Sequence, residues 1–344
     1  MASRQWILRR GSARSGFRYF TENGSPVRSR AVLERVEGLR IPPAYRDVHV
    51  SVSPRAPIQA WGFDARGRRQ YRYHPRAVER GQLRKYYRVA RLGRDLADIR
   101  AALDSDFRSQ GFTKQRVAAC AVRLISAGYL RAGDERYEAE NRTYGAATLH
   151  KSHVTIDGRR IMLRFTGKRG ITQEQEVSDP RLAAFIAKLK KTPGRRLFRY
   201  QTDDASWCDL TLRDVNLYLR ELVGVRYTAK DFRTWGGTLR CAVTLAELGP
   251  APSQRAAKRN VVAAVRAVAS TLGNTPAISR KSYVHPLVID LYLDRGLTIS
   301  EYMHSASGSR PNRREHLRAP EETALIRFLD EHFPDRRRAP RKVA

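Results

Sequence analysis

Residues 58–75 read IQAWGFDARGRRQYRYHP, and the character of the sequence changes where this stretch ends. Within it, two short aromatic runs flank a turn that contains Gly67. Upstream, the sequence DVHVSVSP places Val48, Val50 and Val52 on one face of an expected strand. The dipeptide Asn23-Gly24 is typical of tight hairpin turns. Because few patterns with a helical period occur before residue 72, we predict a small antiparallel β domain here.

From Pro75 onward, apolar residues recur at helical spacing. Helices are predicted within residues 95–107, 113–128, 210–224, 229–249, 253–273, 285–296 and 320–333, with a further helix beginning at Asp179-Pro180. Gly128 and Gly273 suit helix C-termini, and Ser253 suits an N-cap. The stretch HVTIDGRRIMLRFTG, residues 153–167, alternates around Asp157-Gly158 and predicts a β-hairpin inserted among the helices.

The two patterns together predict an α+β protein with two domains. A length of 344 residues exceeds what one hydrophobic core usually serves. We predict an N-terminal β domain in residues 1–78 and a larger, mainly α-helical domain with the inserted hairpin in residues 79–334. Residues 335–344 form a basic tail that we expect to be disordered.

The charge balance is the strongest compositional signal. Sixty-six Lys and Arg against 34 Asp and Glu give a net charge of +32, which favours a polyanionic partner, either nucleic acid or an anionic membrane surface. No segment reaches the ~20 apolar residues of a membrane span, and the first residues lack the apolar core of a signal peptide. The three cysteines, Cys120, Cys208 and Cys241, are far apart, so we expect a reducing, cytoplasmic setting.

Several residues could carry phosphoryl-transfer chemistry. Tyr283 follows a polar loop in GNTPAISRKSYVHP, residues 273–286. Arg131 lies in LRAGDERY, Lys168 in RFTGKRG and Arg233 in KDFRTWGGT, each close to a glycine that lets a ligand approach the backbone. An arginine fork can hold two phosphate oxygens at once. Taken singly, each motif is more typical of a solvated helix face, a turn or a half-buried tyrosine.

A metal-dependent reaction would need clustered ligands, and the sequence shows no recognisable metal motif. Adjacent acids occur at Asp134-Glu135, Asp203-Asp204 and Glu321-Glu322, where helix-end or surface pairs are the simpler interpretation. We therefore predict no metal site and expect that basic side chains take the place of a metal ion.

The motifs in their order along the chain resemble those of a known family. LRAGDERYEAENRTYGAATL, RFTGKRG, KDFRTWGGT and GNTPAISRKSY are similar to the motifs of type IB DNA topoisomerases of the small bacterial and poxvirus kind. The resemblance extends from about residue 39 to residue 291, and RRQYRYHP in the β domain agrees with it. It implies a clamp of two domains that closes around duplex DNA.

The resemblance also implies a role for each motif residue. Tyr283 attacks the scissile phosphodiester and forms a 3′-phosphotyrosyl bond, and Lys168 is the general acid that protonates the departing 5′ oxygen. Arg131 and Arg233 bind the non-bridging oxygens, and Lys230 supports the same step. The family commonly has histidine where Asn274 stands. An asparagine amide still donates a hydrogen bond but carries no positive charge.

Further residues match positions of the family that contact DNA. Gln70, Tyr71 and Tyr73 correspond to residues that reach the major groove or the backbone, although strand residues packing the β domain would show the same pattern. Tyr137, Asn141 and Thr148 match polar positions that touch phosphates near the cleavage site.

The sequence thus predicts a DNA topoisomerase that relaxes supercoils without ATP, metal or another small-molecule cofactor. We expect a monomer bound to duplex DNA in the bacterial nucleoid, with no membrane partner. Two alternatives remain open at this point: a tyrosine recombinase, which shares the tyrosine chemistry, and a non-catalytic nucleic-acid-binding clamp. DFRTWGGT lacks the histidine that recombinases place just after their arginine, which favours the topoisomerase.

Overall fold

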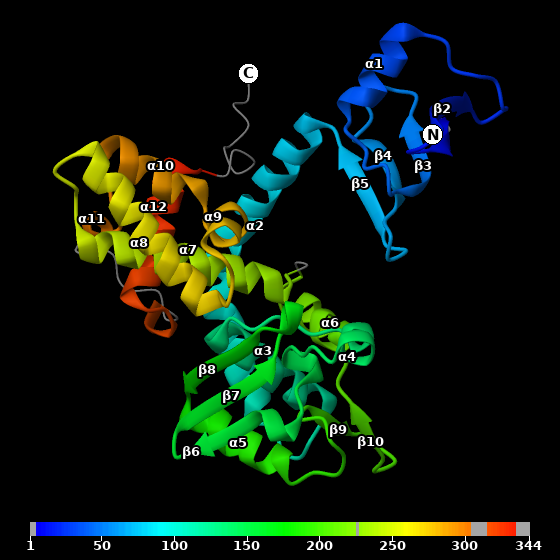
Figure 1. Ribbon diagram of the computed structural model, residues 1–344. Coiled ribbons are helices and arrows are strands. Elements are labelled where there is room, and N and C mark those ends of the chain that lie inside the picture. The colour runs from blue at the N-terminus through cyan, green and yellow to red at the C-terminus, as the bar shows by residue number, and fades with distance from the viewer. Residues whose placement is uncertain (1–4, 225–226, 304–314, 335–344) are drawn as a thin grey trace, which may run out of the picture. The chain divides into compact units, whose positions relative to one another are not determined.

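The computed structural model describes residues 5–224, 227–303 and 315–334. The chain divides into two compact units, Met1–Lys85 and Tyr86–Ala344, and the division falls inside the long helix α2 (Pro75–Phe107) (Figure 1). The domain limits predicted at residues 78 and 79 stay a prediction. The predicted basic tail, residues 335–344, lies outside the described residues.

The first unit is an antiparallel sheet with one helix. The strand order is β2-β1-β3-β4-β5, and the bounds are β1 Trp6–Ser12, β2 Gly16–Thr21, β3 Arg46–Ser51, β4 Ile58–Phe63 and β5 Arg69–Tyr73. Helix α1 (Arg30–Gly38) packs against the sheet through Val36, which is buried with Ile7, Val48, Val50 and Ala60. The predicted antiparallel β domain and the inward face of Val48 and Val50 are confirmed, whereas Val52 lies beyond β3 and is exposed.

Two local features of this unit differ from the prediction. Helix α1 was not expected, because its nine residues are too few to show a clear period among the strands. Asn23-Gly24 forms a turn closed by a bond from Thr21 N to Ser25 O, but no named strand follows it. The first hairpin instead closes between Ser12 and Gly16.

The second unit is mainly helical, as predicted. Its helices after α2 are α3 Lys114–Gly128, α4 Glu135–Asn141, α5 Pro180–Lys190, α6 Leu212–Val223, α7 Ala229–Leu248, α8 Gln254–Leu272, α9 Pro276–Tyr283, α10 Pro286–Arg295, α11 Ser300–Met303 and α12 Pro320–His332. The predicted caps Asp179 and Ser253 accept bonds from backbone N–H groups, and Gly273 ends α8 in the left-handed conformation. The predicted cap at Gly128 is wrong, because Tyr129 takes the left-handed cap position. A Cβ at Gly128 would make a tight contact, 3.2 Å, with a methyl group of Val177.

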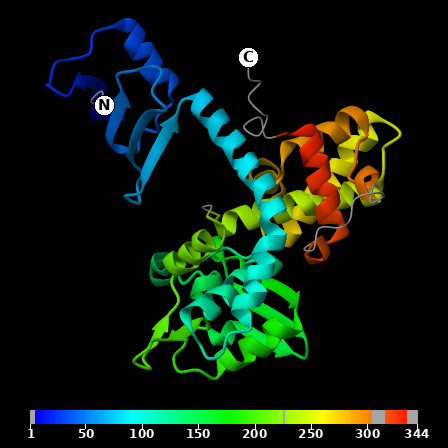
Figure 2. The same ribbon diagram turned by 180° about the vertical axis from the view of Figure 1, so that it is seen from behind.

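A three-stranded sheet lies among these helices. The predicted hairpin is β6 (Val154–Asp157) and β7 (Arg160–Thr166), and a third strand, β8 (Thr172–Ser178), pairs with β7. The sequence of β8, TQEQEVS, has too few apolar residues to predict a strand. Helices α3 and α5 cover one face of this sheet (Figures 1 and 2). A small hairpin of β9 (Arg199–Gln201) and β10 (Trp207–Asp209) completes the unit.

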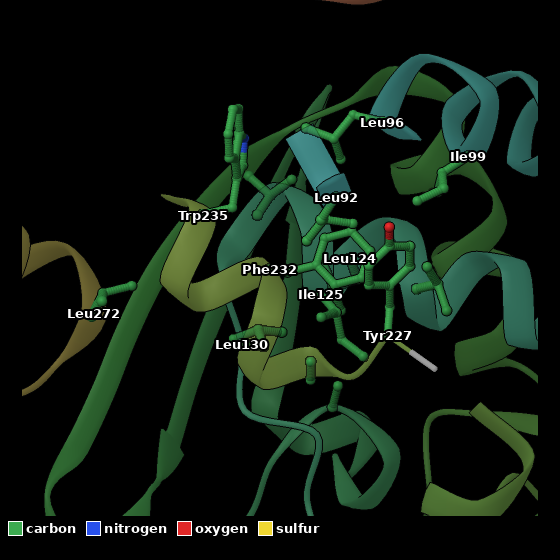
Figure 3. Packing of buried hydrophobic residues seen from close by; sticks show 14 of the residues in the cluster. Leu92, Leu96, Ile99, Leu124, Ile125, Leu130, Tyr227, Phe232, Trp235 and Leu272 are labelled. Atoms are coloured by element: carbon green, nitrogen blue, oxygen red, sulfur yellow. The ribbon is translucent and has the colours of Figure 1, made fainter. Parts of the chain in front are cut away.

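The main core of the second unit fixes the start of helix α7. Phe232 and Trp235 of α7 pack with leucine and isoleucine side chains of α2 and α3, as Figure 3 shows. The Trp235 ring approaches the backbone of α2 so closely that a Cβ at Gly93 would lie 2.3 Å from it. Burying each such large apolar side chain contributes about 1.5–3 kcal/mol. Arg233 lies between these two anchors, so the core determines its position.

In the part of the chain that the structure describes, no individual helix has both the length and the apolar character to cross a membrane. Helices α8 and α9 reach that threshold only jointly, across a bend of 90°. The buried residues of α8, among them Val261, Val265, Val268 and Leu272, belong to the core of this unit.

Candidate active site

Tyr283 is the last residue of the short helix α9. The helix begins at Pro276 after the cap residue Thr275, whose hydroxyl accepts a bond from Ile278 N. The two residues after Tyr283, Val284 and His285, are buried. Tyr283 itself is only partly buried. Its backbone is therefore held in the core while its side chain remains in reach of solvent.

The Gly236-Gly237 pair of helix α7 allows two close approaches beside this tyrosine. A Cβ at Gly237 would lie 2.7 Å from the carbonyl oxygen of Tyr283 and 3.2 Å from its Cβ. A Cβ at Gly236 would lie 2.2 Å from the ring of Tyr129. The same carbonyl of Tyr283 accepts a 3.4 Å bond from Thr238. The glycine pair thus lets the end of α9 rest directly on α7.

Arg233 is buried beneath the Tyr283 ring. Only 2% of its surface is exposed, and its guanidinium carbon lies 5.2 Å from the centroid of that ring. It donates to the carbonyl oxygens of Tyr129 and, at 2.7 Å, Leu272. Burial and the neighbouring charge of Arg131 lower the pKa of Arg233 to about 10, although Tyr283 partly offsets the effect. Sequence reasoning missed Tyr129 because it acts through its backbone carbonyl, which residue type does not reveal.

Arg131 approaches the same tyrosine from the segment that follows α3. Its Nη2 atom donates a 2.7 Å bond to Oδ1 of Asn274. Burial lowers the pKa of the Arg131 guanidinium, and the nearby Tyr283 opposes that shift. Two arginines therefore lie near Tyr283. Asn274 holds one terminal nitrogen of Arg131, and backbone carbonyls hold both terminal nitrogens of Arg233.

Asn274 is fixed by the end of helix α8. Its backbone N–H bonds to Ala269 O at 3.0 Å, while Gly273 before it takes the left-handed conformation. With Oδ1 occupied by Arg131, the amide nitrogen Nδ2 is buried and has no hydrogen-bond partner within the described parts of the chain. A buried donor left unpaired is costly, so this nitrogen is well suited to receive an acceptor from a ligand.

Lys168 lies on the tight connection between β7 and β8, in the short 3-10 turn Lys168–Gly170. A 2.8 Å bond from Gly167 N to Ile171 O closes the turn. The lysine side chain is exposed. Across residues 5–224, 227–303 and 315–334, no described contact joins it to Arg131, Arg233 or Tyr283. The structure therefore brings four of the predicted catalytic residues together, namely Arg131, Arg233, Asn274 and Tyr283, and leaves Lys168 on a separate loop.

Lys230 is at the start of α7, one helical turn before Arg233, and its side chain is exposed. The next residue, Asp231, is buried and pairs with Arg88 at 2.8 Å. Of the His, Cys, Asp and Glu residues that the structure describes, no three gather so that they could hold a metal ion.

The DNA-contact residues predicted in the first unit lie on strand β5. Tyr71 and Tyr73 are 40% and 51% exposed, and their rings stack with centroids 5.8 Å apart. Gln70 points elsewhere and donates a 3.0 Å bond to Asp64. Arg69 covers the ring of Trp61 at 3.7 Å and extends the same exposed face. The two tyrosines are therefore free to meet a partner, whereas Gln70 already has one.

The predicted contacts of the second unit fall into two groups. Tyr137 and Asn141 are exposed on helix α4. Thr148 is fully buried, and its hydroxyl bonds to the backbone N–H and C=O of Gly145. A Cβ at Gly145 would lie 2.7 Å from the carbonyl oxygen of Arg131, so Thr148 holds the segment that packs on Arg131. In this structure its side chain is not presented to solvent.

Two sequence profiles match the chain. The profile of the eukaryotic DNA topoisomerase I catalytic core matches residues 76–306, and that of the bacterial DNA topoisomerase IB N-terminal domain matches residues 16–64. The chain belongs to the type IB DNA topoisomerase family. It is accordingly an enzyme of the topoisomerase class, and the fold predicted from the family resemblance is confirmed.

Named relatives of this topoisomerase chain agree with the profiles. The DNA topoisomerase 1B of Acanthamoeba polyphaga mimivirus is 31% identical, over 83% of this chain and 87% of the relative. The DNA topoisomerase 1B of Vaccinia virus (strain Copenhagen) is 24% identical, over 68% of this chain and 72% of the relative. The DNA topoisomerase 1 of Schizosaccharomyces pombe is 30% identical over 48% of this chain but covers only 20% of that longer relative.

Proposed function

We propose that this topoisomerase relaxes supercoiled duplex DNA by cutting one strand through Tyr283, forming a 3′-phosphotyrosyl intermediate, and rejoining it. The reaction needs neither ATP nor a metal ion. Its energy is conserved in the covalent bond to the tyrosine, because one phosphodiester is exchanged for another. While the strand is open, the free 5′ end swivels and supercoils relax.

One observation carries the proposal: two arginines and an unpaired amide donor converge on a single partly exposed tyrosine. Arg131, after α3, and Arg233, on α7, both approach Tyr283, and Nδ2 of Asn274 has no hydrogen-bond partner in the described structure. A phosphate attacked by the Tyr283 hydroxyl would place its non-bridging oxygens within this set of donors. Preset donors of this kind stabilise the charge of a pentacoordinate transition state.

Arg233 has the more constrained role. Its bonds to Tyr129 and Leu272 use both terminal nitrogens, while Nε lacks a hydrogen-bond partner in the described structure. Its charge therefore acts at a fixed point under the tyrosine ring. Asn274 supplies a neutral hydrogen-bond donor where the family commonly has histidine. The positive charge that faces the phosphate at this point therefore comes from the two arginines.

Lys168 is proposed as the general acid for the 5′ oxygen, with Lys230 in support. A proton donor must come within about 2.6–3.2 Å of the oxygen that it protonates. The side chain of Lys168 is long and exposed, so its amine can come within this distance of the 5′ oxygen when DNA is bound. As the tyrosyl oxygen bonds to phosphorus, the bond to O5′ breaks and this oxygen takes the proton.

The partner is duplex DNA, bound by a monomer in the bacterial nucleoid. A net charge of +32 favours a polyanion. Tyr71 and Tyr73 on β5, with Tyr137 and Asn141 on α4, are exposed and polar enough to bond phosphates or base edges. Gln70 would have to give up its bond to Asp64 before reading a base, and Thr148 would act by holding its loop.

Relaxation of a supercoiled plasmid in EDTA, without ATP, tests the proposal. The wild-type protein should relax the plasmid, and Tyr283→Phe should bind DNA normally yet leave it supercoiled. A folded wild-type protein that requires Mg²⁺ or ATP for relaxation would contradict the proposed mechanism.

A further inference from the structure

The side chain of Gln173 connects two loops of the active site. Gln173 is near the start of strand β8, opposite Phe165 of β7, and only 6% of its surface is exposed. Buried glutamine is uncommon, because its amide must find partners away from water. Here its amide makes only long contacts, of 3.5 Å to Ile171 O and 3.4 Å to Thr172 O. Its hydrogen bonds therefore do not explain why a glutamine is buried at this position.

The packing of Gln173 does suggest a reason. On one side, a Cβ at Gly167 would lie 2.6 Å from Cγ of Gln173. On the other side, a Cβ at Gly273 would lie 2.3 Å from Oε1. The side chain is thus in direct contact with the backbone of both segments.

The conformation of Gly167 strengthens this interpretation. Gly273 has a φ of 59°, which favours glycine on its own account. Gly167 has φ −93° and ψ −169°, an extended conformation that any residue adopts. Glycine at position 167 is therefore explained by the close approach of Gln173.

The two segments carry different groups of the proposed site. Gly167 immediately precedes Lys168, and Gly273 immediately precedes Asn274, which bonds to Arg131. We propose that Gln173 is a positioning residue that sets the Lys168 turn against the Asn274 segment. This inference rests on the proposed role of Lys168 as general acid.

A cavity beside Gln173 indicates how the two loops could move if the glutamine side chain were shortened. The cavity measures about 420 Å³, and its lining includes Gln173, Gly273 and Gln175. Shortening the glutamine would join its volume to this space and remove the spacer between the two loops. The short turn around Lys168 would then shift as a unit, because the bond from Gly167 N to Ile171 O preserves the internal shape of the turn. Lys168 would move relative to Arg131 and Asn274.

The test compares two DNA substrates that differ in one atom. One has the ordinary 5′ oxygen at the scissile phosphate, and the other has sulfur there. A thiolate leaves without protonation, so the sulfur substrate does not need the general acid. A group misplaced by about 1 Å can cost 100-fold in rate, and we expect Gln173→Ala to cleave the oxygen substrate about 10–100-fold more slowly than wild type. It should cleave the sulfur substrate within a few fold of wild type.

Gln175→Ala is the matched control for shortening a glutamine on this strand. Gln175 lies two residues further along the same face of β8 and also lines the cavity, but its Oε1 would lie 3.4 Å from a Cβ at Gly128, and the side chain is not among the closest neighbours of Gly167 or Gly273. The control variant should cleave both substrates like wild type. If Gln173→Ala does not fold, Gly167→Ala replaces it, since the new Cβ presses on Gln173 and should give the same substrate preference.

Two results would overturn the inference: cleavage of the oxygen substrate at the wild-type rate, or an equal loss on both substrates in a folded variant. Lys168→Ala separates this failure from that of the proposed function. If Lys168→Ala is not rescued by sulfur, then Lys168 is not the general acid and the underlying mechanism fails. If it is rescued and folded Gln173→Ala is not, only the positioning role of Gln173 fails.

Discussion

Arg131 donates a 2.7 Å hydrogen bond to Oδ1 of Asn274, a residue 143 positions further along the chain. The bond fixes which end of the asparagine amide is free, because Oδ1 is occupied and Nδ2 is left without a partner in the described residues. An asparagine held in this way is a donor, as the proposed phosphate site requires. The proposed role of this residue, which replaces the histidine more usual in the family, depends on that orientation.

Removing this donor should slow DNA cleavage. We expect Asn274→Ala to reduce the cleavage rate about 10²–10³-fold, the usual cost of losing one preset donor. Asn274→Asp should be at least as slow, because an acceptor and a negative charge then face the phosphate. Single-turnover cleavage at saturating DNA measures the effect. A rate within a few fold of wild type for either variant would remove Asn274 from the mechanism.

Asn274→His offers a complementary test through pH. A neutral amide does not titrate, whereas an unperturbed imidazole has a pKa of about 6.5. The histidine variant should keep much of the cleavage activity. Its cleavage rate should also fall as pH rises through the pKa of the imidazole, because the extra positive charge then disappears. The ratio of variant to wild-type cleavage rates between pH 5.5 and 8 reports this change, and a ratio that does not vary would speak against a phosphate contact.

The contact between α7 and the end of α9 should be sensitive to one methyl group. Gly237→Ala places a Cβ 2.7 Å from the carbonyl oxygen of Tyr283, so that the tyrosine must shift. We expect cleavage to slow about 10–100-fold while DNA affinity stays close to wild type. Gly81→Ala is the control, since Gly81 is also helical and a Cβ there meets no atom within 4 Å. Equal cleavage rates for both variants would show that α9 does not need this close approach.

Tyr71 and Tyr73 should contribute to binding and not to chemistry. Replacing both with alanine removes two contacts worth about 1 kcal/mol each, which predicts a 10–30-fold weaker affinity for duplex DNA. The cleavage rate at saturating DNA should be unchanged. Met162→Ala is the control, because Met162 is also 40% exposed but lies on β7. Unaltered affinity of the double variant would exclude this face of β5 from DNA binding.

An ion pair between Arg100 of α2 and the buried Glu322 of α12 should make stability depend on acid pH. Glu322 accepts bonds of 2.6 and 2.8 Å from Arg100. Burial opposes ionisation of Glu322, but the bonds and charge of Arg100 outweigh it and hold its pKa below the ordinary value. The unfolded chain therefore binds more protons at mildly acid pH. This stabilisation is present above the unfolded value of ~4.3 and is lost as pH falls from there through the lower pKa of Glu322 in the folded protein.

Glu322→Gln should remove this pH dependence. At pH 7 the variant should lose about 1.5–3 kcal/mol of unfolding free energy, the value of hydrogen bonds to a charged group. Its difference from wild type should shrink between pH 5 and pH 3 in thermal melts. Glu321→Gln, in the same helical turn, is the control and should show no such trend. A difference that stays constant over this range would contradict the assignment.

The sequence was sufficient for much of the fold, for physical reasons. Helix α8 is bounded by Ser253 and Gly273, whose capping preferences are local properties of the chain. Strand β8 could not be predicted, because its polar residues form a strand only through pairing with β7. The acids Glu321-Glu322, interpreted as a helix-end or surface pair, lie in the first turn of α12. Glu322 is nevertheless buried, and its partnership with Arg100 depends on tertiary packing.

The same distinction applies to the site. The motifs nominated Arg131, Arg233, Asn274 and Tyr283 through a family resemblance, and the fold brings them together. The orientation of Asn274 could not be predicted, since it follows from a contact between distant segments. The proposed role of Gln173 could not be predicted, because it depends on contacts with the backbone of two distant segments. In addition, polar residues on strands usually face solvent.

Identification of the residue joined to DNA tests the central claim most directly. A substrate whose short 5′ product diffuses away would trap the covalent complex, which is then denatured, digested and sequenced by mass spectrometry. We predict that the DNA 3′-phosphate is attached to Tyr283 and that Tyr283→Phe yields no adduct. Attachment to another residue, or an adduct that persists in Tyr283→Phe, would contradict the account.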